Sequence, residues 1–202
     1  MKIFKEKLKE NNIDPENIIL NFHTSFCHKN FSKGRPIYTK VDIILNKEKK
    51  KIGRYAFTLI NKNNFDKSQN NIFRAAEEES GELVNAVNPF VDENLELPED
   101  LINPNFIYIN RMYLNKEYRN KGIGAYSFAI LYKVLSRKAS LITVFPEPYD
   151  YDNDQEYDEG VFKKEKENMI KFLKWFDFKQ SELNPTIYYV NTDKKLSLLN
   201  NK

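Results

Sequence analysis

The chain has 202 residues, of which 41% are hydrophobic, 14% aromatic and 30% charged, a composition that suits one large domain with a substantial core. Its formal net charge is only +3, which gives no reason to expect a nucleic-acid or membrane partner. The single cysteine, Cys27, excludes a disulfide framework. No apolar run reaches the roughly 18 residues of a membrane span, and the first residues do not resemble a signal peptide, so we expect a cytoplasmic protein.

The first part of the chain predicts one short helix followed by three strands. Residues 2–10 form an amphipathic helical pattern that closes before Pro15. Runs rich in β-branched and aromatic residues follow, and a charged connection over 46–51 joins two of them in the manner of a hairpin. The predicted strands are residues 18–26, 37–45 and 52–60.

The rest of the chain alternates helices and strands. Apolar residues recur at helical spacing over 72–91 and predict one long helix. Such alternation without repeats is typical of an α/β fold, and we expect a single domain over residues 1–202. The later predicted elements are a strand at 106–114, a helix from 123 onward, a strand at 140–145, a helix at 162–176 and a strand at 186–190.

The glycine-rich turn that follows the strand at 106–114 is the most informative motif. Its sequence is Arg119-Asn120-Lys121-Gly122-Ile123-Gly124. The first amides of a helix have no internal partner, the helix dipole favours anions there, and glycine lets a ligand approach the backbone closely. The turn therefore predicts a phosphate-binding site, although the Walker pattern and the dinucleotide fingerprint are both absent. The alternative is a tight turn that binds nothing.

The pattern R-x-x-G-x-G between a strand and a helix resembles the acetyl-CoA pyrophosphate loop of the GNAT acyltransferase superfamily. The order of elements is similar as well, and the resemblance covers roughly residues 36–192, with 1–35 and the tail 193–202 outside it. The segment Phe172–Phe178 looks like the family's F-Y-x-x-x-G-F motif. The resemblance implies a GNAT-like fold, in which helices flank a central mixed, mostly antiparallel sheet. The additional helix at 72–91 is similar to that of relatives from phages and plasmids.

Direct acyl transfer from the thioester of acetyl-CoA to an amine is the activity that the resemblance implies. The backbone of Met112 and Leu114 would pair with the pantetheine arm, and the Leu114 amide would stabilise the oxyanion, an effect of about 3 kcal/mol per donor. The pyrophosphate would be held by the amides and cations of the glycine-rich turn, which are Arg119, Asn120, Lys121, Gly122, Ile123 and Gly124.

The catalytic acid and base of the family are absent from their usual positions. The tyrosine of the F-Y-x-x-x-G-F motif corresponds to Leu173, which cannot donate a proton. The glycine of that motif corresponds to Asp177, which also tolerates a left-handed turn. The carboxylate that some members carry early in the pantetheine strand corresponds to Tyr108. Either these roles have moved to other residues, or the fold is used without transfer.

The acidic, tyrosine-rich segment 146–159 is where we expect displaced catalytic groups. It follows the carboxyl end of a strand, where open α/β sheets commonly bind ligands. Its carboxylates can take a proton from an ammonium group, and its phenols can protonate a thiolate. We expect Glu147, Tyr149 and Tyr151 to act there together with Tyr108, and the acidic field to attract a cationic acceptor. The alternative is a solvated loop without a catalytic role.

Two other features have ordinary structural interpretations. His23, Cys27 and His28 lie close together in the sequence, but they lack the paired spacing and the further ligand of a zinc site, so we expect ordinary strand residues and no metal. Trp175 follows Phe172 and precedes further phenylalanines, and we expect it in the core rather than on a surface that stacks against a base.

Three functions remain open at this point. The first is an acetyl-CoA-dependent N-acetyltransferase whose acceptor is a small molecule or another amine-bearing compound. The second is a catalytically silent GNAT-fold protein with a binding or regulatory role, which binds CoA or a protein partner. The third is an acyltransferase that acts on a macromolecule, such as a tRNA or a protein. The glycine-rich turn favours the first, and Leu173 favours the second.

Overall fold

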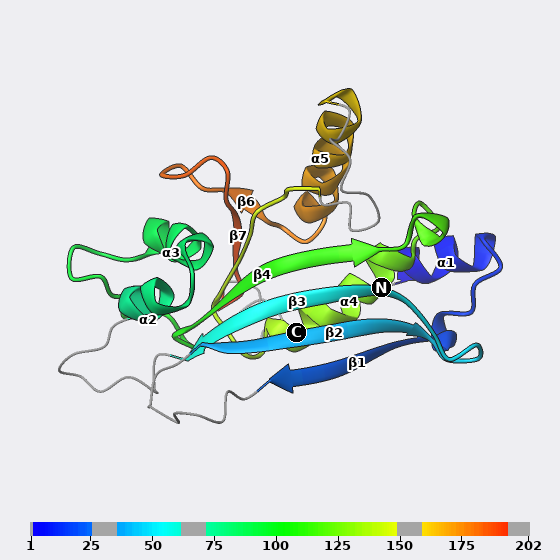
Figure 1. The fold of residues 1–202 in the computed structure, drawn as a ribbon, viewed down its shortest axis with the longest axis horizontal. Helices are drawn as coiled ribbons and strands as arrows, with labels where there is room; N and C mark the ends of the chain where they lie inside the picture. The colour runs from blue at the N-terminus through cyan, green and yellow to red at the C-terminus, as the bar shows by residue number, and fades with distance from the viewer. Residues whose placement is uncertain (1, 26–35, 62–71, 149–158, 194–202) are drawn as a thin grey trace.

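The computed structural model describes residues 2–25, 36–61, 72–148 and 159–193. They form a seven-stranded sheet with the strand order β1-β2-β3-β4-β5-β7-β6 (Figure 1). Every neighbouring pair is antiparallel except β4 and β5, which are parallel. The strands are β1 (Ile18–Ser25), β2 (Ile37–Leu45), β3 (Lys50–Asn61), β4 (Asn105–Leu114), β5 (Leu141–Val144), β6 (Lys179–Gln180) and β7 (Tyr188–Asn191).

Helices cover both faces of this sheet (Figure 1). The expected α/β class, with a central mixed, mostly antiparallel sheet and flanking helices, is therefore confirmed. In the part of the chain that the structure describes, none of the helices has the length and apolar character needed to cross a membrane. The helices are α1 (Lys2–Glu10), α2 (Ile72–Glu79), α3 (Gly81–Val87), α4 (Ile123–Leu135) and α5 (Glu159–Lys174), with short 3-10 turns at Pro15–Asn17, Asn88–Phe90 and Lys116–Tyr118.

The alternation of side chains along β4 creates two cores. Ile107 and Ile109 are buried on one face, in a cluster that includes α1, α4 and the end of α5. Phe106 and Tyr108 are buried on the opposite face, in a cluster with α2 and α3. Because successive side chains of a strand point to opposite faces, β4 holds the two helical layers together, and its residues are placed with little freedom.

The prediction of one long helix over residues 72–91 is wrong, because the structure divides this segment into two helices at Ser80. Ser80 has an extended backbone (φ −167°, ψ 153°), and its hydroxyl accepts a hydrogen bond from the Leu83 amide at 3.2 Å. Serine is a favoured N-cap because its side chain satisfies an amide that the helix cannot. The apolar spacing continues across this cap, and therefore it predicted a single helix where the chain forms α2 and α3.

The partnership between β4 and β5 ends halfway along β4. The two strands pair only from Phe106 to Ile109, and Pro146 follows the end of β5. At the same place Asn110 is an extra residue on β4, since Phe57 of β3 pairs with Ile109 and Ala56 with Arg111. A bulge of this kind bends a strand away from its former direction. The last part of β4, residues 110–114, therefore keeps β3 on one edge while its other edge has no strand beside it in the described structure.

The end of α5 is closed by a left-handed residue, as expected for Asp177. Its φ is 63°, its amide donates to Lys174 O, and the Phe178 amide donates to Leu173 O. This pair of hydrogen bonds is the Schellman arrangement, in which the residue beyond the cap packs against the last turn. Leu173 and Phe178 are accordingly both buried in the same cluster.

Candidate functional site

Two pockets lie beside the last part of β4, where β4 is no longer paired with β5. The larger has a volume of about 560 Å³ and the smaller about 220 Å³. Met112 of β4 and Met169 of α5 line both of them, so the pockets adjoin at these two side chains. The larger pocket extends from there over the glycine-rich turn, and the smaller one extends toward α3.

The glycine-rich turn presents a run of backbone amides to the larger pocket. Asn120 (φ 63°) and Gly122 (φ 84°) are left-handed, and Gly122 is the N-cap of α4. The first hydrogen bond of the helix is donated by the Tyr126 amide to Gly122 O at 3.0 Å. Among the described residues, no acceptor is bonded to the amides of residues 120–125. The turn therefore has the donors and the positive end of a helix dipole that an anion requires.

Tyr55 of β3 fixes this turn against the sheet. Its hydroxyl lies 3.1 Å from Gly124 O and 2.7 Å from the Ser127 hydroxyl. Ser127 in turn donates to Ile123 O at 2.8 Å. The Tyr55 side chain is buried, and burial raises the pKa of its phenol well above the ordinary value. Tyr55 is therefore a neutral brace under the first turn of α4, and it holds the amides in place.

Arg119 acts as a second brace. Its Nε donates to Leu114 O at 2.8 Å, and its Nη1 lies 3.2 Å from Glu165 Oε1 of α5. This arginine thus joins the end of β4, the glycine-rich turn and α5, and it neutralises the carboxylate that lines the larger pocket. The side chain of Lys121 lies over the Tyr118 ring at 5.8 Å, and Ile123 is fully buried.

The outer edge of β4 offers further backbone groups to the same pocket. The Asn115 amide donates to Ile52 O of β3 at 2.9 Å. Hydrogen bonding alternates along an antiparallel pair, so the amides of Met112 and Leu114 point away from β3. Both residues line the larger pocket. The pocket therefore has a strand edge along one wall and helix amides at its end.

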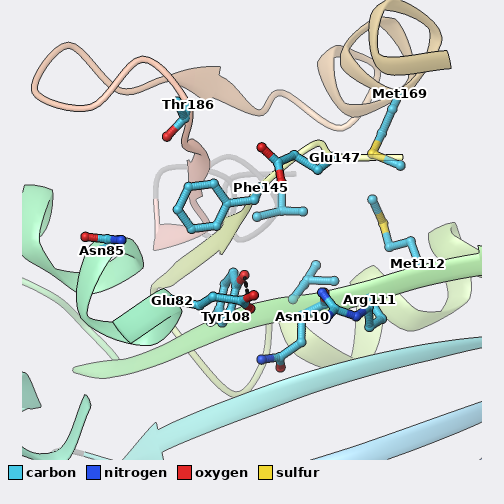
Figure 2. A pocket seen from close by; sticks show the side chains of 12 residues that line it. Glu82, Asn85, Tyr108, Asn110, Arg111, Met112, Phe145, Glu147, Met169 and Thr186 are labelled. Carbon is cyan, nitrogen blue, oxygen red and sulfur yellow. Dashed lines mark hydrogen bonds between the residues drawn. The ribbon is translucent and has the colours of Figure 1, made fainter. Parts of the chain in front are cut away.

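The smaller pocket contains two carboxylates and a buried phenol. The Tyr108 hydroxyl donates to Glu82 Oε2 of α3 at 3.3 Å, and Glu147 lies across the pocket beside Phe145 and Met169 (Figure 2). Burial raises the pKa of Tyr108 well above its ordinary value, and the charge of Glu82 raises it further. Tyr108 is consequently protonated at neutral pH and can only donate a proton there.

The structure distributes the predicted site residues over the two pockets. Tyr108 and Glu147 line the smaller one, whereas Tyr149 and Tyr151 lie outside the described residues. Leu173 is completely buried in the core and faces neither pocket. The predicted cofactor-binding residues that line the larger pocket are Met112, Leu114, Arg119, Asn120, Gly122 and Gly124.

Several pocket residues were missed by the sequence analysis or placed wrongly, and Glu82, Lys7 and Trp175 are three of them. Glu82 and Lys7 line the pockets, but their contacts join distant parts of the chain and leave no local signal. Trp175 was expected in the core, yet its side chain is 63% exposed, lines the larger pocket and stacks on Phe4 of α1, with ring centroids 6.1 Å apart. The helix ends at Lys174, and the closing turn carries Trp175 outward.

Of the histidine and cysteine cluster, His23 is the member that lies within the described residues. His23 Nε2 lies 3.4 Å from Asp42 Oδ2, while Cys27 and His28 lie outside the described residues. The part of the chain that the structure describes contains no group of three or more His, Cys, Asp or Glu side chains able to hold a metal ion.

A comparison of the chain with protein-family models found no match, and none of the curated proteins matches it.

Proposed function

We propose that the chain is an acetyl-CoA-dependent N-acetyltransferase with a GNAT-like fold, which transfers an acetyl group directly to an amine. The observation that carries this proposal is the larger pocket, which combines an open strand edge with the amides of residues 120–125. A strand edge suits the amide groups of pantetheine, and helix amides suit a pyrophosphate. Both features occur in one pocket of about 560 Å³.

The donor would lie along β4, with its pyrophosphate on the glycine-rich turn and its thioester beside Met112 and Met169, where the two pockets adjoin. The amides of Met112 and Leu114 lie along this path. Of these, the Leu114 amide is the oxyanion donor that the sequence resemblance implies. One such donor lowers the barrier by about 3 kcal/mol.

The acceptor amine would enter through the smaller pocket. Glu82 takes a proton from its ammonium form, and the free amine attacks the thioester carbonyl to form a carbon–nitrogen bond. The carbon–sulfur bond then breaks and leaves a thiolate. Tyr108 passes its proton to that thiolate and regains one from Glu82 through the 3.3 Å hydrogen bond. One proton from the ammonium group thus ends on the thiol, the attacking nitrogen releases its second proton to solvent as the amide forms, and both side chains return to their starting states.

The arrangement of carboxylates favours a cationic acceptor. Glu82 and Glu147 line opposite sides of the smaller pocket (Figure 2), and no ion pair joins either carboxylate to a cation in the described structure. Arg111 also lines this pocket, but the two carboxylates outweigh its single charge, so a protonated amine entering between them would be attracted before it loses its proton.

A CoA-binding protein without transfer is the second candidate, and the burial of Leu173 favours it. In that case the larger pocket would bind acetyl-CoA, and no amine would be acetylated. Calorimetry and a thiol-release assay on the same sample separate the two candidates, because the first measures binding and the second measures turnover.

The decisive test is calorimetric titration with acetyl-CoA of the wild type and of two variants at Gly124. A Cβ at this position would lie 3.9 Å from Leu114 Cδ2, an ordinary contact, and the backbone is not left-handed. Gly124→Ala should therefore bind like the wild type, with a dissociation constant on the order of micromolar. Gly124→Phe should lose binding, since the ring would cover the amides. Equal affinity in all three proteins would refute the pyrophosphate site.

A further inference from the structure

Trp175 is the only tryptophan in the chain, and 63% of its side chain is exposed. One face of its ring rests on Phe4, at an interplanar angle of 28°. The residue also lines the larger pocket, at the end of α5 away from Met169. Met169 lies six positions earlier in the chain, which corresponds to about 9 Å along a helix. Trp175 is thus well separated from the place where the two pockets adjoin.

Positive charge surrounds this end of the pocket. Lys7 of α1 and Lys171 of α5 both line it. The aliphatic stem of Lys7 packs at the glycine-rich turn, where its Cγ lies 3.2 Å from the position that a Cβ of Gly122 would occupy. Glu165 also lines the pocket, but Arg119 neutralises it at 3.2 Å. The charge near Trp175 is therefore that of the two lysines, and it favours a phosphorylated ligand.

We propose that Trp175 is the stacking platform for the purine base of the donor, with Lys7 and Lys171 beside the ribose phosphate. This inference rests on the proposed function, since it assumes an acyl-CoA in the larger pocket. Aromatic side chains bind bases through their π-faces, and removal of one such ring weakens binding by about tenfold. The enzyme would consequently select a nucleotide-bearing donor over an acyl phosphopantetheine that lacks the nucleotide.

The stacking of Trp175 on Phe4 also favours a role in binding. If the indole only shielded Phe4 from solvent, neither a pocket nor lysines beside the ring would be expected. Here the ring is held by Phe4 while the pocket and the two lysines lie around it. A ring that is already fixed loses little conformational entropy when a base stacks on it.

The single tryptophan makes the platform directly measurable by fluorescence. Adenosine bisphosphate, the nucleotide end of CoA, and acetyl-CoA should both quench the emission of the wild type, whereas acetyl-phosphopantetheine should not. Trp175→Leu should weaken the binding of acetyl-CoA about tenfold by calorimetry, and Trp175→Phe should recover most of that loss. Neither variant should change the affinity for acetyl-phosphopantetheine. Because the residue is exposed, both variants should fold, which circular dichroism can verify.

The outcomes separate this inference from the proposed function. Wild-type binding of acetyl-CoA together with an unchanged affinity in Trp175→Leu would overturn the platform and leave the proposed function standing. An equal loss of affinity for both donors in Trp175→Leu would also overturn it, because the ring would then support the pocket generally. If the wild type bound neither donor, the proposed function would fail, and the platform with it.

Discussion

The hydrogen bond between Glu82 and Tyr108 joins two different elements, the helix α3 and the strand β4. Tyr108 occupies the position on β4 where the resemblance leads one to expect a carboxylate, and Glu82 supplies a carboxylate to the same place from α3. Because burial raises the pKa of Tyr108, the phenol is a weak acid by itself. It can protonate a thiolate efficiently only if Glu82 returns a proton to it in the same step. The two side chains should therefore act as a unit.

Replacing either member of this pair should slow transfer without weakening donor binding. We expect Glu82→Gln and Tyr108→Phe each to lower kcat by roughly 10²–10⁴-fold, the range for loss of acid–base catalysis, while calorimetry shows unchanged acetyl-CoA affinity. The double variant should be little slower than either single one, because the roles are coupled.

Glu147→Gln is the matched control for that experiment, since it removes a carboxylate on the other side of the smaller pocket. It should raise the KM of a cationic amine and leave kcat nearly unchanged. If the fall in kcat of the Glu82 and Tyr108 double variant equalled the product of the two single falls, the two residues would act independently.

The division between α2 and α3 determines where Glu82 lies. Ser80 caps α3 through its hydroxyl, and Glu82 follows in the first turn of that helix. A continuous helix over 72–91 would rotate every residue beyond the break and move Glu82 relative to β4. The cap is thus a local feature of sequence with a direct consequence for the pocket.

Substitutions at the cap should change stability in opposite directions. Ser80→Ala removes the bond to the Leu83 amide and should lower the free energy of unfolding by about 1 kcal/mol. Gly81→Ala should raise it by roughly 0.5–1 kcal/mol, because a Cβ there meets nothing within 4 Å and the backbone is not left-handed. Urea denaturation of both variants measures these values. A free energy of unfolding equal to that of the wild type in Ser80→Ala would show that the hydrogen bond of the Ser80 hydroxyl contributes nothing to stability.

Local sequence signals predicted most elements and failed where distant residues decide the outcome. The β-branched runs predicted the strands, and the glycine-rich turn was correctly placed before α4. Asp177 adopts the left-handed conformation expected of it. The contact of Glu82 with Tyr108 and the exposure of Trp175 depend instead on α3 packing near β4 and α1 packing near α5. No local pattern encodes such tertiary contacts.

The sheet joins the two pockets to the core of the protein. Its strands continue beneath both helical layers, and β3 carries Tyr55 under the glycine-rich turn. Tyr55 is only 3% exposed, so the rigidity of the turn depends on a phenol buried in the main core. Stability of the fold and geometry of the pocket should therefore respond together to changes at Tyr55.

Alkaline pH should reveal this dependence through the unfolding free energy. Burial raises the pKa of Tyr55 in the folded state far above its ordinary value of 10.0. When the pH rises above the ordinary pKa of 10.0, the unfolded chain releases the phenolic proton of Tyr55 while the folded chain keeps it. The contribution of Tyr55 to the free energy of unfolding is therefore complete below about pH 10 and is lost as the pH rises further. The loss for one such group approaches about 1.4 kcal/mol per pH unit.

Tyr55→Phe isolates this contribution, because it keeps the ring and removes the ionisable hydroxyl. At about pH 8 the variant should be less stable by about 1 kcal/mol, since the bonds to Gly124 O and Ser127 are lost. By about pH 11 the wild type should have lost this advantage, as its phenol now favours unfolding. Urea denaturation of both proteins over this pH range gives the difference directly. A constant difference would mean that the Tyr55 phenol titrates alike in the folded and unfolded states and is not the buried brace of the α4 turn.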